Sequence, residues 1–217
     1  MVAEGVFTTA NLVSYCRAED VLSLLRAWDT SGWGTPEELL TDATALLATT
    51  RAAIESAAGR DFFLHPDETV RLDGTGTRVL LLAPLGLTPV VAVERVAVGG
   101  RALPASDWLF YADEAAIVLA AGASIGERFP VGRQNVEVTL DWGHEATPPE
   151  VVAAQAKLAA AELLARNTGE QGGVEALSLG DYTVRYGGGR FAHSIRRLVT
   201  EAQEALARYR RLDFCAI

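Results

Sequence analysis

The sequence predicts an α+β fold in which a discontinuous helical bundle domain carries an inserted antiparallel β domain. Apolar residues recur at helical spacing in the first and last thirds of the chain, whereas the middle third consists of short β-rich runs separated by turn residues. We expect residues 1–67 and 144–217 to form the helical domain and residues 68–143 to form the β domain. With 217 residues, of which 49% are hydrophobic, the chain is long enough to bury a core.

The first third contains two predicted helices. Residues 18–29 place apolar side chains at helical spacing behind an acidic first turn, which favours a short helix. The next helix has a stronger start signal, since Thr35 can act as an N-cap, a proline follows it, and Glu38 completes a capping box. Apolar residues then recur up to Gly59, a residue type that ends helices in the left-handed conformation. We expect a helix over residues 36–58.

The last third contains two more predicted helices. Thr147 and Glu150 form a second capping-box pattern in front of an alanine-rich run, which predicts a helix over residues 149–166. Residues 191–211 place their apolar side chains on one stripe and several arginines on another face. This pattern predicts a final amphipathic helix.

The middle third alternates β-rich runs with turns that contain glycine and acidic residues. This spacing favours an antiparallel meander or a small barrel over β-α-β units. The expected strands are Thr69–Leu72, Arg78–Leu82, Val90–Val98, Trp108–Tyr111, Ile117–Leu119 and Asn135–Trp142.

The segment between the last two helices, residues 168–189, has no helical pattern and is long for a connector. Its apolar residues alternate with polar ones, so one edge is apolar and needs to be covered. A strand added to a neighbouring chain would cover it. The residues that we expect at this contact between subunits are Leu177, Leu179, Tyr182, Val184 and Tyr186.

The net charge is −9 at pH 7, although residues 190–211 hold six arginines against two glutamates. General affinity for nucleic acid is not expected, because phosphate binding needs cations over a whole face. No apolar run is long enough to span a membrane, and the N-terminal sequence lacks the pattern of a secretory signal. Cys16 and Cys215 support neither a disulfide framework nor a zinc site, and they fit a reducing, intracellular setting.

No catalytic, metal-binding or cofactor-binding site is predicted. His65, His144 and His193 are widely separated, and no second histidine follows His144 at the HExxH zinc spacing. No serine lies in a nucleophile-elbow pattern, and the acidic doublets lie in first helical turns, where they offset the helix dipole. Because no nucleophile, base and orienting group can be assembled, an enzyme is the least supported class.

The end of the chain combines three arginines with a short apolar tail. Cations at a helix C-terminus complement its dipole, so the cluster also fits a solvated helix end. The tail is too short to form its own core, so it either folds back or docks into another protein, and docking is our hypothesis. The residues that we expect to dock are Arg208, Arg210, Arg211, Leu212, Phe214 and Ile217.

Several segments follow one another in a recognisable order along nearly the whole chain. They are Ala53–Glu55, Gly59–Phe62, Asn135–Gly143, Pro148–Pro149, Leu177–Val184 and Ala207–Leu212. Each is common by itself, but their order and spacing resemble the head-tail connector proteins (adaptor or head-completion proteins) of tailed double-stranded DNA bacteriophages.

The resemblance implies a structural subunit of the virion neck, assembled in the host cytoplasm without cofactor, catalysis or membrane. It implies a ring, a dodecamer in this family, that binds the portal protein and a tail-side neck protein, either a stopper or a tail terminator. Double-stranded DNA would pass through the ring without sequence recognition. In this interpretation Arg208, Arg210, Arg211, Phe214 and Ile217 would dock onto the portal, and ring closure would use heterologous contacts.

A second function class remains open from the residues alone. Trp108, Tyr111 and Trp142 could line an aromatic platform in the β domain, which would make it a ligand-binding or carbohydrate-binding module.

Overall fold

The computed structural model describes residues 14–82, 85–168, 174–179, 182–187 and 191–209. The chain divides into two compact units, a helical unit and a β-rich unit, and the α+β class is confirmed. The helical unit comprises Met1–Phe62 and Thr147–Ile217, and the β-rich unit comprises Phe63–Ala146. The boundaries between the two units lie at residues 62/63 and 146/147, whereas the boundaries expected from the sequence are 67/68 and 143/144.

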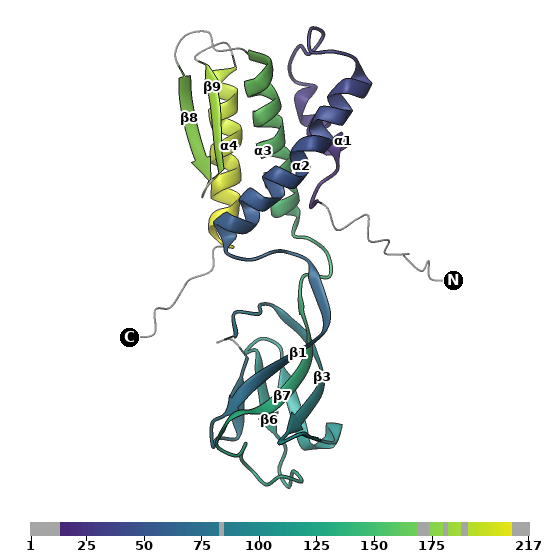
Figure 1. The fold of residues 1–217 in the computed structure, drawn as a ribbon, viewed down its shortest axis with the longest axis vertical. Coiled ribbons are helices and arrows are strands. Elements are labelled where there is room, and N and C mark those ends of the chain that lie inside the picture. The colour runs from purple at the N-terminus through teal and green to yellow at the C-terminus, as the bar shows by residue number, and fades with distance from the viewer. Residues whose placement is uncertain (1–13, 83–84, 169–173, 180–181, 188–190, 210–217) are drawn as a thin grey trace, which may run out of the picture. The chain divides into compact units, whose positions relative to one another are not determined.

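The helical unit contains four helices in the described residues. They are α1 (Ala18–Leu25), α2 (Pro36–Ala58), α3 (Pro149–Thr168) and α4 (Ala192–Ala207). In Figure 1, α3 and α4 run side by side, and both α1 and α2 pack against α3. The bounds of α2 are those expected from the sequence, whereas α1 and α4 are shorter than the expected 18–29 and 191–211.

Both ends of α2 have the caps that the sequence predicts. The Thr35 hydroxyl accepts a hydrogen bond from the Glu38 backbone N–H at 3.3 Å, and the Glu38 carboxylate accepts one from the Thr35 N–H at 2.7 Å. At the other end Gly59 adopts φ +70°, and its N–H donates to the Glu55 carbonyl at 2.8 Å. Local chemistry therefore sets both ends of this helix.

The core of the helical unit is built around α3. This helix is buried on almost every side, and its alanines let the neighbouring helices approach closely. Its fully buried side chains include Ala154, Leu158, Ala159, Ala160 and Leu163. Because α1 and α2 come from one end of the chain and α3 and α4 from the other, neither end can bury this core without the other.

A β-hairpin joins α3 to α4. Strands β8 (Val174–Leu179) and β9 (Tyr182–Gly187) pair in antiparallel fashion, with Leu177 opposite Val184. The hairpin lies beside α3 and α4 (Figure 1).

The β-rich unit contains two antiparallel sheets. The first has the order β1 (Leu64–Gly74), β7 (Gly132–Gly143), β3 (Val90–Val98) and β4 (Arg101–Ala102). The second has the order β2 (Val79–Leu81), β6 (Ala116–Leu119) and β5 (Trp108–Tyr111), and the 3-10 turn η3 (Ala105–Asp107) precedes β5.

The two sheets share one hydrophobic core. Alternate residues of β7, namely Val136, Val138 and Leu140, are fully buried in it together with Leu80 and Ile117 of the second sheet. The strands β3 and β5 have their expected bounds. Strand β1 starts before the expected Thr69 because its first residues pair with the end of β7, and β4 was not expected.

Candidate functional site

The end of α4, where the sequence predicts docking, is tied to the start of α3. The Arg208 guanidinium lies 3.0 Å from the Glu150 carboxylate, and the Tyr209 hydroxyl donates to the same carboxylate at 3.1 Å. Hydrogen bonds from its own backbone N–H and from Tyr209, with Arg208 beside it, hold the pKa of Glu150 below its usual range. Glu150 lies in the first turn of α3, where a negative charge also complements the helix dipole.

An aromatic cluster lies next to this ion pair. The fully buried Phe62 ring meets Tyr209 edge to face at 5.4 Å between centroids and meets Tyr15 in the same way at 5.7 Å. The Arg60 guanidinium lies 5.5 Å from the centre of the Phe62 ring and 6.0 Å from that of Tyr209. Phe62, the last residue of this unit before the β-rich unit begins, is therefore held by aromatic rings from both ends of the chain.

Of the six residues predicted to dock onto a portal, Arg208 lies in the described part of the chain. Its side chain is 58% exposed while it pairs with Glu150. The other five, Arg210, Arg211, Leu212, Phe214 and Ile217, lie outside the described residues. The portal-docking role of this set stays a prediction.

The five residues predicted at a subunit contact share one face of the β8–β9 hairpin. Leu179, Val184 and Tyr186 are buried there by α3 and α4 of the same chain. The Tyr182 hydroxyl donates to the Glu162 carboxylate of α3 at 3.3 Å, and Leu177, opposite Val184, is half-buried.

This burial corrects one reason given for the prediction. The apolar edge of the hairpin does not need a neighbouring chain to cover it, because the helices of its own unit do so. The opposite face exposes Ser178, Thr183 and Arg185 to solvent. A contact between subunits through the hairpin stays a prediction, and these polar residues form the side left open for it.

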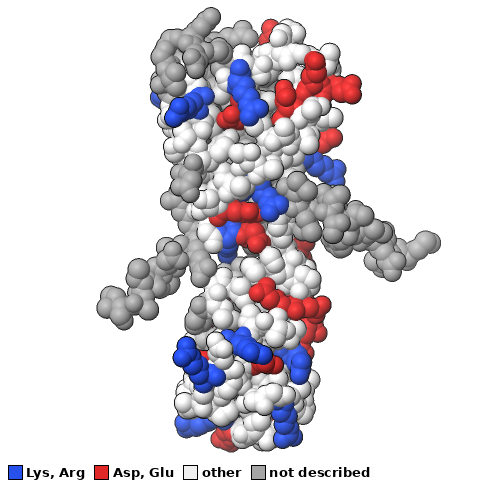
Figure 2. Space-filling model, viewed as in Figure 1, with Lys and Arg blue, Asp and Glu red and all other residues white. Residues whose placement is uncertain are grey.

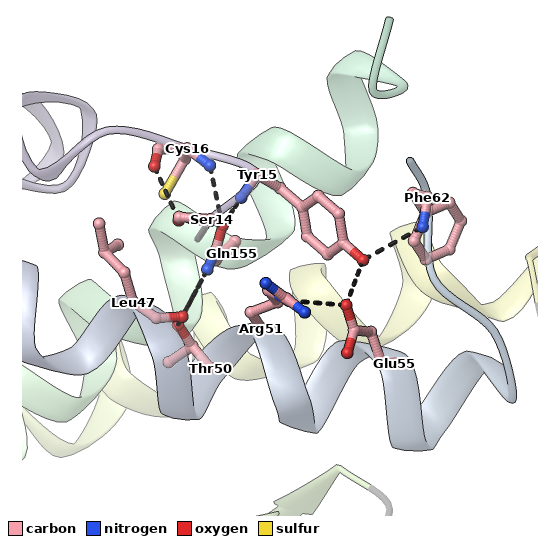
Figure 3. A network of polar contacts seen from close by, with 9 residues as sticks. All are labelled: Ser14, Tyr15, Cys16, Leu47, Thr50, Arg51, Glu55, Phe62 and Gln155. Atoms are coloured by element: carbon pink, nitrogen blue, oxygen red, sulfur yellow. Dashed lines mark hydrogen bonds and ion pairs between the residues drawn. The ribbon is translucent and has the colours of Figure 1, made fainter. Parts of the chain in front are cut away.

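A buried polar network fixes the N-terminal segment to the helices (Figure 3). The side-chain oxygen of Gln155, in the middle of α3, accepts hydrogen bonds from the backbone N–H groups of Tyr15 and Cys16 at 2.7 and 2.8 Å. It also accepts one from the Ser14 hydroxyl at 2.9 Å. The Gln155 amide nitrogen donates to the Leu47 carbonyl of α2 at 2.7 Å, so one side chain joins three segments of the chain.

A second branch of the network runs through Tyr15 (Figure 3). Its hydroxyl donates to the Glu55 carboxylate at 2.6 Å and accepts a hydrogen bond from the Phe62 N–H at 3.1 Å. Arg51 pairs with the same carboxylate at 2.7 Å. Burial, followed by the hydrogen bond to Glu55, raises the pKa of Tyr15 above its usual range. Every one of these bonds holds backbone or helices in place, so the network is structural.

Sequence reasoning missed Gln155. The available signal was a single amide side chain inside the alanine-rich run of α3, where a buried polar group must find partners.

The described residues contain no group of three or more side chains that could hold a metal ion. His65 instead stacks on Trp142 at 4.1 Å between ring centroids, and the Trp142 indole N–H donates to Glu68 at 2.5 Å. Within the same described ranges, none of the helices has the length and apolar character needed to cross a bilayer.

The three aromatic residues considered for a ligand platform do not lie on one surface. Trp108 and Tyr111 are an odd number of positions apart on β5, so they point to opposite faces of that strand. Trp108 packs against the core, Tyr111 is 47% exposed on the outer face, and Trp142 belongs to the other sheet. The structure therefore gives a carbohydrate-binding platform no support.

No family model matches the sequence, and no curated protein matches it. Among solved structures, the chain is similar to one from the neck of an empty GTA (phage-like gene transfer agent) particle computed with C6 symmetry. The two chains are 17% identical, the alignment covers 100% of this chain and 99% of the other, and the TM-score is 0.45.

Proposed function

We propose that this chain is a structural subunit of the neck of a tailed-phage-type particle, a head-tail connector that forms a ring between the portal and the tail. The observation that carries the proposal is the order of elements. A helical unit made from both ends of the chain encloses an inserted β-rich unit, and a hairpin and an amphipathic helix follow its central helix. This order agrees with what the sequence resemblance implies for connector proteins.

The chemistry of the described residues is consistent with a structural role. The buried polar side chains of the helical unit are used to fix the N-terminal segment and the ends of the helices. A subunit that works by assembly needs such rigidity and no reacting group. We therefore propose that the chain has no catalytic activity and takes no cofactor.

The charge distribution is consistent with DNA passing a ring without being gripped. The net charge of −9 repels phosphates, and the face in Figure 2 shows acidic and basic side chains interspersed, with large areas that carry neither. We expect that the assembled ring does not retard linear double-stranded DNA in a gel at low salt. Retention of DNA by the ring would contradict this part of the proposal.

The ring is tested by mixing the full chain with the portal protein of the same particle and measuring the mass of the complex. Native mass spectrometry or electron microscopy should show about twelve connector chains per portal ring, as the resemblance implies (cf.). A complex with one connector chain per portal ring would overturn the proposal.

The docking site is tested with a variant that lacks Asp213–Ile217. We expect its melting temperature to be unchanged and its co-sedimentation with the portal to be lost. Val131→Ser is the matched control, since it also removes exposed apolar surface, at a residue that is 82% exposed in the β-rich unit. This control should keep portal binding, and unchanged binding of the truncated chain would exclude the tail as the docking element.

A further inference from the structure

Both faces of the β2–β6–β5 sheet are apolar. Its three strands read VLL, AIVL and WLFY, so neither face carries a charged side chain. Leu80, Ile117 and Leu119 point inward and are almost completely buried in the core of the β-rich unit. An antiparallel sheet with one face in water normally alternates apolar with polar residues, and this sheet does not.

Strand register places the outward side chains in two rows. In the first row, Val118 of the central strand β6 lies between Val79 of β2 and Leu109 of β5. In the second row, Ala116 of β6 lies between Leu81 of β2 and Tyr111 of β5. Residues directly opposite in an antiparallel pair share a face. The outward face is thus formed by Val79, Leu81, Leu109, Tyr111 and Val118 around Ala116, which is itself fully buried, and we call it the outer apolar face.

The outer apolar face holds most of the large apolar side chains that the described residues expose. Val79 is 38% exposed, Leu81 54%, Leu109 55% and Tyr111 47%. Isolated apolar residues on a surface are ordinary, but a contiguous group on one sheet face marks a surface that another molecule covers.

The two ends of this face have opposite charge. At the end where β2 starts and β6 stops, Arg78 donates from Nε to the Leu119 carbonyl at 2.7 Å, and Arg128 reaches the Gly76 carbonyl. These two exposed arginines outnumber the exposed Glu127, and the carboxylate of the buried Asp107 at this end accepts from the Ser124 N–H at 2.8 Å. At the other end the β5–β6 turn exposes Asp113 and Glu114. A four-residue strand separates the two ends by roughly 10 Å.

A second copy of the chain complements this pattern. When two copies pack face to face about a two-fold axis that crosses the strands, the basic end of each meets the acidic end of the other, and both contacts form at once. An axis parallel to the strands would instead place like charges together. Exposed charges add little affinity, but they select between such orientations.

We propose that the outer apolar face is a self-association surface, covered in the free chain by the same face of a second copy with its strands antiparallel. A two-fold contact of this kind cannot close a larger ring, because rings need heterologous contacts. The dimer is therefore a state of the free chain, independent of the proposed ring, and it keeps the face out of water before assembly.

The dimer is expected to be weak. Stable complexes bury about 800 Å² per partner, and three strands of three or four residues cover much less. Sedimentation of the full chain from about 10 μM to 1 mM spans the affinities of so small an interface. We expect a reversible monomer–dimer equilibrium in this range. A chain that stays monomeric throughout would overturn the proposal.

Two variants test the apolar contact. Leu109→Asp and Tyr111→Lys should each weaken dimerisation by about tenfold or more, since every residue of a two-fold contact counts twice. Val131→Ser is the control, because it changes a more exposed apolar residue of the same unit outside the three strands and adds no charge beside Gly76 and Arg128. It should leave the equilibrium unchanged. If Leu109→Asp dissociates to the same extent as the unaltered chain, whether from a dimer or from a larger assembly, another surface is responsible for the self-association.

A charge exchange tests the orientation. Arg78→Glu combined with Arg128→Glu makes both ends of the face acidic, and Asp113→Lys with Glu114→Lys makes both ends basic, so each variant alone should dimerise less well than the unaltered chain. A one-to-one mixture restores opposite charges at both contacts and should dimerise at least as well as the unaltered chain. Because the mixed dimer has opposite charges at both contacts in either orientation, its recovery shows that the charges act, and the loss in each variant alone tests the orientation. If each variant alone dimerises as well as the unaltered chain, the antiparallel arrangement is wrong. Arg128→Glu alone removes part of the positive charge without disturbing the Arg78 hydrogen bond to the Leu119 carbonyl, and it should weaken dimerisation less than the double change.

Discussion

Gln155 contributes a fully buried amide whose partners lie far away in the sequence. Its oxygen accepts from the N–H groups of Tyr15 and Cys16, and its nitrogen donates to the carbonyl of Leu47. A buried amide with all its partners in place costs little, whereas each N–H left without one costs about 1–3 kcal/mol. Together with the Tyr15 hydroxyl, this residue therefore holds the N-terminal segment on the helical unit.

The first prediction concerns Gln155→Leu. We expect it to lower the free energy of unfolding by about 3 kcal/mol, because it leaves buried N–H groups without an acceptor. Urea denaturation measures the change. The matched control is Gln203→Leu, whose side chain donates to the Ser178 carbonyl at an exposed position. It should cost less than about 1 kcal/mol, and a similar loss in both variants would contradict the role assigned to burial.

Cys16 is buried beside this network, with 6% of its surface exposed. Burial, followed by repulsion from Asp20, raises the pKa of its thiol to about 12. A raised pKa means that the fold favours the neutral thiol. The stability that this provides is present below pH 9.0, the ordinary value, and is lost as the pH rises through about 12.

The second prediction follows from the protected thiol. In a Cys215→Ser background at pH 8, Cys16 should react with a disulfide reagent at least about 100-fold more slowly in the folded chain than in urea. The thiolate released by the reagent gives the rate. Rapid reaction in the folded chain would show that the N-terminal segment leaves the helices readily. A variant that also carries Cys16→Ala should not react at all.

At the scale of elements, the β8–β9 hairpin behaves as part of the helical core. Its apolar face rests on α3 and α4, and Gln203 of α4 holds the backbone of β8 at Ser178. The hairpin's alternation was visible in the sequence, but the identity of the surface that covers it was not. The alternation of apolar and polar residues is the same whether a neighbouring chain or the helices of the same chain bury the apolar face.

The third prediction distinguishes burial of the hairpin by its own chain from burial by a neighbouring chain. Val184→Ala should destabilise the isolated chain by about 2 kcal/mol, because a fully buried side chain loses its contacts with α3 and α4. Thr183→Ala, on the exposed face of the same strand, should change stability by less than about 0.5 kcal/mol. Thermal unfolding at two protein concentrations measures both. If Val184→Ala lowers stability only in the assembled state, a neighbouring chain covers the apolar face of the hairpin.

At the scale of the whole molecule, carboxylates with lowered pKa values occur in both units. Hydrogen bonds from Thr35 lower the pKa of Glu38, the Lys157 ammonium lowers that of Glu201, and hydrogen bonds from Ser124 lower that of Asp107. The unfolded chain therefore binds more protons than the folded chain in acid. Stability from these groups is present above their ordinary values of 3.8 to 4.5 and is lost as the pH falls through the lowered pKa values.

The fourth prediction is a fall in melting temperature as the pH decreases from about 5 to 2. Asp107→Asn should make that fall shallower, since the amide cannot be protonated there, while lowering the melting temperature at pH 7. Asp113→Asn is the control, because Asp113 lies on an exposed turn. It should leave the dependence of melting temperature on pH unchanged. Identical pH profiles for both variants would show that Asp107 does not contribute to the loss of stability in acid.

The sequence by itself determined the elements whose signals are local. The capping box at Thr35 and Glu38, the left-handed Gly59 and the apolar alternation of the β8–β9 hairpin each depend on residues only a few positions apart, so they could be interpreted without the fold. Only the tertiary structure decided what covers each apolar surface. It placed the hairpin on α3 and α4, joined Gln155 to residues more than a hundred positions away and left the outer apolar face open. Burial depends on which distant segments meet, and periodicity alone does not specify the partner.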